Sequence, residues 1–423
     1  MESIDHILHF VTNLGKEMLK CGSNVERVTL NTEMICYAYR LQSVSVRISN
    51  VHITVCARNE SGMFRTVQVT VPPSNFNLER LRKLNDLAIY VKKKTPRPTH
   101  LERILKRELK VKTDYPTPVI LGGYVLAMAS LCRIFGGAWQ DISVVVLNTV
   151  LLFLLSLVWA KARLNRIITN VVNMFLCGSL AFAFTYLGFA RHFSVIIITN
   201  AFFLIPGIQM VNSVRNILCA NEMNGIIELI KVILEVVTIV AGLWLAFLCF
   251  GKGIAGEFED SIVNMGASPG DVELVVLSLL ASLGFAVVFR VKPSHLPLAA
   301  LGGALTRIVY LVLMHFLPYR IVFTALAAFS TALYAELLAI AYKTPATIWL
   351  YPSVIPLIPG DLFYFAMAGL IVQNNELFSK YALECVLALI GISVGFVLCS
   401  TFVHYVRKIK FRKAKRGKQT KNA

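Results

Sequence analysis

Ten long apolar runs occupy the chain from residue 117 to residue 406, and they constrain its fold more than any other feature. A helix needs about 20 apolar residues to cross the hydrocarbon core of a bilayer, and the runs have this length. In lipid every backbone polar group must be bonded within the segment, so each run is expected to be a helix. With 56% hydrophobic residues, the composition is also typical of membrane proteins. The runs lie at about 117–137, 140–160, 167–190, 193–214, 226–250, 272–290, 295–316, 321–342, 345–372 and 381–406. We therefore expect a polytopic α-helical membrane protein with about ten transmembrane helices.

The segment before these runs has a different pattern, because charges recur throughout it and no apolar run is long enough to span a bilayer. Apolar residues at helical spacing predict helices over residues 3–20, 24–41, 77–94 and 99–110. Asn77 and Thr99 are placed to cap the last two helices. The stretches VSVRISN, VHITVCA and FRTVQVTV alternate or are β-branched, which predicts three strands. We expect a cytoplasmic α+β domain over residues 1–115.

The formal net charge of +18 is interpreted here as an orientation signal, because the chain has no basic module interleaved with aromatic residues that would indicate nucleic acid. The basic clusters beside apolar runs are KARLNR at 161–166, Arg215, RVK at 290–292, Lys343 and the tail from Arg407. With the N-terminus inside, all of them fall on the cytoplasmic side, as the positive-inside rule requires. The first residues, MESIDHILHF, lack the features of a signal peptide. We expect a multi-pass protein of the cell (plasma or inner) membrane with both termini in the cytoplasm and no nucleic-acid partner.

The tetrapeptide LIPG occurs twice inside apolar runs, at residues 204–207 and 357–360, a separation of 153 residues. At the same offset the run 167–190 superimposes on 320–342, so the repeating unit contains five spans. An odd number of spans repeated in tandem crosses the membrane in opposite directions, which relates the halves by an inverted pseudo-two-fold axis, as in many transporters. We expect a first five-helix repeat at 116–251, an external loop at 252–271, a second inverted five-helix repeat at 272–406 and a basic cytoplasmic tail at 407–423.

Each LIPG is expected to break its helix near the bilayer midplane. Pro206 and Pro359 lack an amide proton and would free the carbonyls of Phe202 and Ile355. Freed carbonyls suit an ammonium group, and half-helix N-termini suit an anion, so facing breaks would suit an amino acid or a small carboxylate. Kinks that serve only packing, and ordinary interhelical hydrogen bonds, are the alternative interpretation. The residues expected to bind substrate are Asn200, Pro206, Gly207, Gln209, Asn212, Arg307, Pro359, Gly360 and Tyr364.

Three carboxylates inside the apolar runs are the candidates for proton coupling: Asp361, Glu336 and Glu235. An ionisable group at membrane depth is costly, and desolvation favours its protonated form, so such a group can bind and release a proton. Asp361 is the first candidate because it directly follows the second Pro-Gly pair, although it could instead cap the broken half-helix. Lys231 lies four residues before Glu235, so these two could form a structural ion pair. Arg307 could bind a substrate carboxylate through two hydrogen bonds, or it could anchor a helix.

No pattern in the sequence indicates an enzyme, a cofactor or a metal site. The nine cysteines are scattered without CxxC spacing, and His6 and His9 share a helix turn without further ligands. No nucleophile, base and acid stand together. A membrane enzyme with a catalytic N-terminal domain stays the alternative from another class. A passive channel is disfavoured, because broken helices with a deep carboxylate suit gated exchange better than a continuous pore.

Three patches of the sequence resemble the threonine/serine exporter family. CGSNVERV and NLERLRKLNDL are similar to its cytoplasmic domain, LIPGIQMVNSVRNI to the loop after its fourth span, and KTPATIWLYPSVIPLIPG to its second half, which some relatives encode as a separate chain. The resemblance implies a secondary exporter of small amino acids such as threonine and serine, driven by the proton motive force, or else of dicarboxylates such as succinate. The implied partners are the small-molecule substrate, protons and the lipid bilayer, and assembly into a homo-oligomer stays open.

Overall fold

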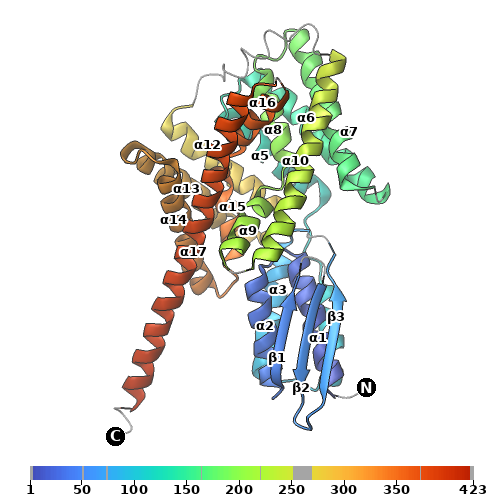
Figure 1. The fold of residues 1–423 in the computed structure, drawn as a ribbon, viewed down its shortest axis with the longest axis vertical. Coiled ribbons are helices and arrows are strands. Elements are labelled where there is room, and N and C mark those ends of the chain that lie inside the picture. The colour runs from blue at the N-terminus through green and yellow to red at the C-terminus, as the bar shows by residue number, and fades with distance from the viewer. Residues whose placement is uncertain are drawn as a thin grey trace. The chain divides into compact units, whose positions relative to one another are not determined.

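The computed structural model describes residues 3–49, 52–72, 75–162, 164–219, 221–250, 269–371 and 373–419, and for residues 371 and 407–419 it describes the backbone only. Residues 252–268 of the predicted external loop (252–271) lie outside the described residues. The last four residues of the predicted tail also lie outside them. The chain divides into two compact units (Figure 1). The first unit consists of Met1–Thr117, Val287–Leu296 and Leu338–Trp349, and the second of Pro118–Ala286, Pro297–Leu337 and Leu350–Ala423.

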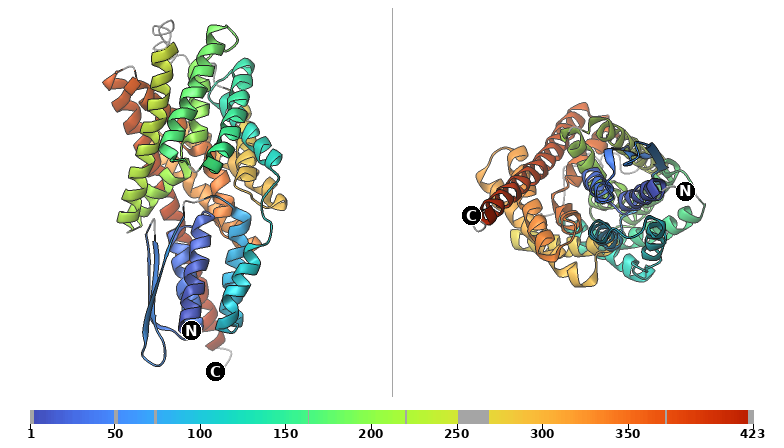
Figure 2. Two further views of the ribbon diagram at one scale, coloured as in Figure 1. Left: turned by 90° about the vertical axis from the view of Figure 1, so that its right-hand side faces the viewer. Right: turned by 90° about the horizontal axis from the view of Figure 1, so that it is seen from below.

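A three-stranded antiparallel sheet with helices on one face forms the main body of the first unit (Figure 2). The strands are β1 (Gln42–Ile48), β2 (His52–Arg58) and β3 (Phe64–Thr70), in that order across the sheet. Every second residue of β2 is buried, at Ile53, Val55 and Ala57, because side chains alternate between the faces of a sheet. The helices α1 (Ser3–Lys20) and α2 (Val25–Ala38) contact the sheet. The three predicted strands are confirmed.

Two further helices of the first unit are α3 (Leu78–Lys94) and α4 (Pro98–Leu109). Asn77 caps α3 as predicted, because its side-chain oxygen accepts the amide of Arg80 at 2.9 Å. The predicted cap at Thr99 is wrong, since α4 already begins at Pro98 and Arg97 is its N-cap residue. Proline suits the first helical position because that position needs no amide donor and because its fixed φ is already helical.

The apolar runs form twelve helical segments in the described part of the chain. The first six are α5 (Thr117–Ile134), α6 (Trp139–Ala162), α7 (Arg166–Tyr186), α8 (Phe193–Leu204), α9 (Gly207–Leu218) and α10 (Glu222–Phe250). The other six are α12 (Asp271–Val288), α13 (Leu296–Phe316) after the 3-10 turn η2 (Pro293–His295), α14 (Arg320–Tyr342), α15 (Thr347–Val354) with the 3-10 turn η3 (Ile355–Leu357), α16 (Gly360–Ile371) and α17 (Asn375–Gln419). By length and composition, eight of them can cross a membrane, or up to ten spans if each of two bent pairs counts as one. The prediction of a polytopic helical protein is confirmed.

The helix boundaries recur along the chain at nearly constant spacing. With η2 counted as part of α13, each helix from α12 to α17 begins 153 or 154 residues after its counterpart from α5 to α10. The two bent pairs, α8 with α9 and α15 with α16, occupy equivalent places in this series. The spacing found between the two LIPG sequences therefore extends to all twelve segments.

Helices of the second unit approach each other closely where glycine faces a neighbouring backbone. A Cβ atom at Gly284 of α12 would lie 2.6 Å from the carbonyl oxygen of Gly123 in α5. A Cβ atom at Gly242 of α10 would likewise collide with the carbonyl oxygen of Val171 in α7. Between membrane helices, small residues of this kind replace the hydrophobic effect as the basis of tight packing.

Candidate functional site

The two broken helices share one backbone geometry. The first break (residues 205–207) bends its helix pair by 60°, and the second break (residues 358–360) bends its pair by 51°. Ile205 has φ −69° and ψ 127°, and Ile358 has φ −65° and ψ 125°. In each break the glycine amide donates to the carbonyl of the isoleucine two residues earlier, at 2.9 Å for Gly207 and 2.8 Å for Gly360. Pro206, with φ −78° and ψ 63°, is the centre of an inverse γ-turn. The repeated sequence is thus a repeated backbone structure.

One consequence predicted for the second break is wrong. Pro359 was expected to leave the carbonyl of Ile355 free, but this carbonyl accepts the amide of Ile358 at 3.1 Å. The chain tightens into the 3-10 turn η3 just before the break, so a donor three residues ahead replaces the missing one. The carbonyl of Ile355 is therefore not the unpaired acceptor that the sequence predicted at the second break.

The two breaks contact each other inside the second unit. A Cβ atom at Gly207 would lie 3.1 Å from a methyl group of Ile358, so the first break packs against the second. A Cβ atom at Gly360 would collide with the ring of Phe202, which is in the helix before the first break. The Phe202 ring also contacts Phe135 and Phe285, at centroid distances of 6.4 and 6.2 Å. The two Pro-Gly pairs, 206–207 and 359–360, were predicted separately and thus belong to breaks that contact each other.

A charged cluster adjoins the second break. Asp361, partly buried in the first turn of α16, interacts electrostatically with Arg307 and Tyr310 of α13 and with Cys385 of α17. The Arg307 Nε donates to the Ser278 hydroxyl of α12 at 3.0 Å, and its guanidinium lies 5.7 Å from the centroid of the Tyr310 ring. One cation and one carboxylate from α13 and α16 therefore act on each other electrostatically near the second break. The sequence predicted both residues but gave no reason to place them together.

Uncharged polar residues adjoin the first break. Asn200 is 1% exposed, and neither its amide nitrogen nor its amide oxygen has a hydrogen-bond partner among the described residues. Asn212 of α9 donates to the Tyr351 hydroxyl of α15 at 3.4 Å, which joins the two bent pairs a second time. Tyr364 of α16 is fully buried, and its hydroxyl lies beside Ser194 of α8. Gln209, two residues past Gly207, is partly exposed.

The other two predicted carboxylates belong to separate clusters. Glu235 of α10 pairs with Arg166 at the start of α7, with 3.3 Å between Nη2 and Oε2. Lys231, the partner expected from helical spacing, acts on Glu235 only as a weaker electrostatic neighbour, so the predicted ion pair is corrected to Arg166. Glu336 of α14 is partly buried and lies near Cys399 of α17.

Sequence reasoning missed a buried carboxylate. Asp141, near the start of α6, is completely buried and accepts four hydrogen bonds. Its donors are the amides of Ala138, Arg191 and His192, at 2.8, 2.8 and 3.1 Å, and Nδ1 of His192 at 2.7 Å. The carboxylate therefore ties the start of α8 to the start of α6. The only signal in the sequence is an acidic residue in the first turn after GGAW, which is typical of a capping residue.

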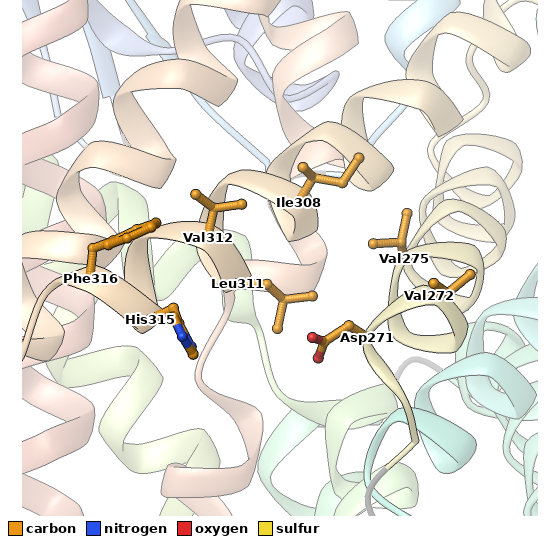
Figure 3. A pocket seen from close by; sticks show the side chains of 8 residues that line it. All are labelled: Asp271, Val272, Val275, Ile308, Leu311, Val312, His315 and Phe316. Carbon is orange, nitrogen blue, oxygen red and sulfur yellow. The ribbon is translucent and has the colours of Figure 1, made fainter.

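A cavity of about 380 Å³ lies between α12 and α13 (Figure 3), and none of the residues that line it belongs to the two breaks. Six apolar side chains line it, and Asp271 and His315 flank Leu311 at one side. A zwitterionic amino acid needs several convergent polar groups, which this lining lacks. The cavity therefore differs in chemistry from the site at the breaks. Among the described residues no group of three or more His, Cys, Asp or Glu could hold a metal ion.

Comparison with known protein families identifies the chain. Residues 9–249 match a family model of the threonine/serine exporters, and residues 274–402 match a second model described as Threonine/Serine exporter, ThrE. No curated protein and no solved structure matches the chain. The first family model covers the sheet, the first break and the helices to α10, and the second covers the second break and the charged cluster. The chain is therefore a membrane transporter that belongs to the threonine/serine exporter family.

Proposed function

We propose that this protein is a proton-coupled exporter of threonine, serine or similar small amino acids, and that it works by alternating access around the two breaks. The observation that carries the proposal is the mutual contact of the breaks, Gly207 against Ile358 and Gly360 against Phe202, beside Asp361 and Arg307. Broken helices in contact from two halves of a chain are a common form of substrate site in secondary transporters.

The regular spacing of the helix starts supports two inverted halves. Each half contains five spans if a bent pair counts as one, so the second half would cross the membrane in the opposite direction to the first. The basic segments then orient residues 1–117 and the C-terminus toward the cytoplasm. In this arrangement the second half supplies the charged cluster and the first half supplies the polar amide of Asn200.

The charges at the second break fit a zwitterion. Arg307 would bind the substrate carboxylate, and the ionised Asp361 would bind its ammonium group. Asn200 can donate and accept at once, so it would bind the hydroxyl group of threonine or serine. On the outside, a proton that binds Asp361 removes the negative charge and releases the substrate. Proton and ammonium then compete for one carboxylate, and this competition makes the transport an antiport.

Counterflow in proteoliposomes tests the proposal. The vesicles are preloaded with threonine, serine, alanine or succinate, and uptake of the labelled compound is measured with and without a pH gradient. We expect the wild type to exchange threonine or serine and the gradient to drive net movement. Asp361→Asn should lose the gradient effect, because an amide does not exchange a proton in this pH range.

Glu235→Gln is the matched control, since it also replaces a carboxylate by an amide inside an apolar helix. It should keep the response to the gradient, because Glu235 is paired with Arg166. If succinate is the only compound exchanged, the substrate is a dicarboxylate and not a small amino acid. If no compound moves in vesicles with folded protein, the transport proposal is wrong. Chemical conversion of a compound would instead favour a membrane enzyme.

A further inference from the structure

The turn between α12 and α13 lies in the first unit, where it caps a helix of the N-terminal segment. The first amides of any α-helix lack partners within the helix. In α3 the amide of Leu78 donates to the carbonyl of Phe289 at 2.9 Å, and the amide of Glu79 donates to the carbonyl of Arg290 at 3.1 Å. The next two amides bond to Asn77. The N-terminus of α3 is thus completed by two carbonyls of a turn more than 200 residues later in the chain.

The side chain of Arg290 makes three polar contacts in this turn. Its Nε lies 2.9 Å from Oδ1 of Asp114, and its Nη1 donates to the side chain of Asn75 at 3.1 Å and to the carbonyl of Phe76 at 2.9 Å. The Tyr115 hydroxyl donates to the next carbonyl, that of Val291, at 2.6 Å. One guanidinium therefore joins the turn to the segment before α3 and to the segment after α4. A planar fork of donors suits this bridging role better than an ammonium group does.

The backbone conformation of Arg290 is unfavourable for an arginine. Its φ is +56°, a left-handed conformation that costs a non-glycine residue on the order of 1 kcal/mol. The equivalent turn between α5 and α6 has Gly136 with φ +88° at the same place, two residues after the helix end. Glycine would therefore be the relaxed choice at residue 290. The contacts of the guanidinium offset the strain.

We propose that Arg290 is a positioning residue through which residues 1–117 act on transport. This inference rests on the proposed function. The helix α13 begins in the turn that Arg290 fastens, and about 16 Å further along its axis it carries Arg307. The helix α12, which ends in the same turn, carries Ser278, the hydrogen-bond acceptor of Arg307. A shift of the turn therefore moves both helices that orient the guanidinium at the substrate site.

Replacing Arg290 by glycine separates positioning from folding. Arg290→Gly removes the guanidinium contacts together with the backbone strain that they offset, so the thermal midpoint should change little. We expect its maximal rate of threonine or serine exchange to fall about 10-fold, in the range reported for coupling residues. Arg290→Lys should be intermediate, because it keeps the charge but not the planar fork. Lys343→Gly is the matched control: it relaxes another left-handed residue of the first unit, with an exposed side chain, and should exchange at the wild-type rate.

The outcomes separate this inference from the transport proposal. If the wild type exchanges substrate and Arg290→Gly exchanges it equally fast, the positioning role is wrong and the transport function stands. If Arg290→Gly is unstable, Asp114→Asn removes the same ion pair from a half-exposed partner, and a wild-type exchange rate in that variant also overturns the role. If the wild type moves no substrate, hydrogen–deuterium exchange still tests whether Arg290 positions α13. Peptides from 296–316 should exchange faster in Arg290→Gly than in the wild type, and equal rates contradict the proposal.

Discussion

The first and the second break are alike in backbone and different in side chains. Both are closed by a glycine amide that donates two residues back, and the isoleucines before the prolines agree within 4° in φ and 2° in ψ. After the glycine, the first break continues with the buried Ile208 and the second with Asp361. Packing differs too, because Gly360 is pressed against an aromatic ring and Gly207 only against methyl groups.

This comparison shows which part of the site the repeated sequence controls. Ile-Pro-Gly is enough to set the bend, because proline removes a donor and the glycine amide finds a near carbonyl instead. The chemistry depends on the following residue and on neighbouring helices, and these differ between the halves. One break can therefore carry the charge while the other supplies polar groups and close packing.

Ile208→Asp gives the first break the carboxylate of the second, and we expect the largest effect from it. Ile208 is 7% exposed, and a carboxylate buried there without a partner should destabilise the protein by about 3–5 kcal/mol. The positive end of α9 would recover at most about 1 kcal/mol of this. Thermal unfolding in detergent measures the loss, with Ile208→Val as the control for volume. A midpoint close to that of the wild type would mean that the two breaks are chemically interchangeable.

Replacing the two glycines by alanine tests the difference in packing. Gly360→Ala should cost about 1–3 kcal/mol, because the Phe202 ring is itself held by Phe135 and Phe285 and cannot move aside. Gly207→Ala should cost less than about 1 kcal/mol, since the methyl groups of Ile358 lie at 3.1 and 3.2 Å and can shift slightly. Gly122→Ala is the control, because a Cβ atom there meets open space. Equal losses at both breaks would contradict the proposed asymmetry.

Asn200→Leu should have the smallest effect on stability, and the effect should be favourable. An apolar side chain of similar size removes two buried polar atoms that have no partner among the described residues, each of which costs about 1 kcal/mol or more. The thermal midpoint should stay equal or rise by a few degrees, while counterflow of threonine should fall. A variant that keeps full transport would show that Asn200 is only a packing residue. Ser353→Ala, at the equivalent place before the second break, is the comparison.

Local patterns in the sequence predicted a large part of this fold. The apolar runs, the three strands, the Asn77 cap and both breaks depend on neighbours within a few residues, so periodicity and turn chemistry identify them. The electrostatic interaction of Asp361 with Arg307 and the four donors of Asp141 could not be predicted, since they link segments that are far apart in the chain. The partner of Glu235 shows the same limit. Helical spacing indicated Lys231, but the packing of α7 against α10 brings Arg166 closer.

The distribution of the cysteines allows two of them to be labelled without introducing new cysteines. Of the nine, Cys219 and Cys249 are exposed. Cys219 directly follows α9, three residues before α10 begins, and Cys249 lies in the last turn of α10, a helix about 44 Å long. Burial raises the pKa of the Cys21 and Cys36 thiols to about 12, so these two stay unreactive at neutral pH. In the proposed orientation, an impermeant maleimide added to intact cells reaches Cys249 but not Cys219. Spin labels on the same pair would then measure, without any engineered site, whether the distance between these two points of the first half changes during a transport cycle.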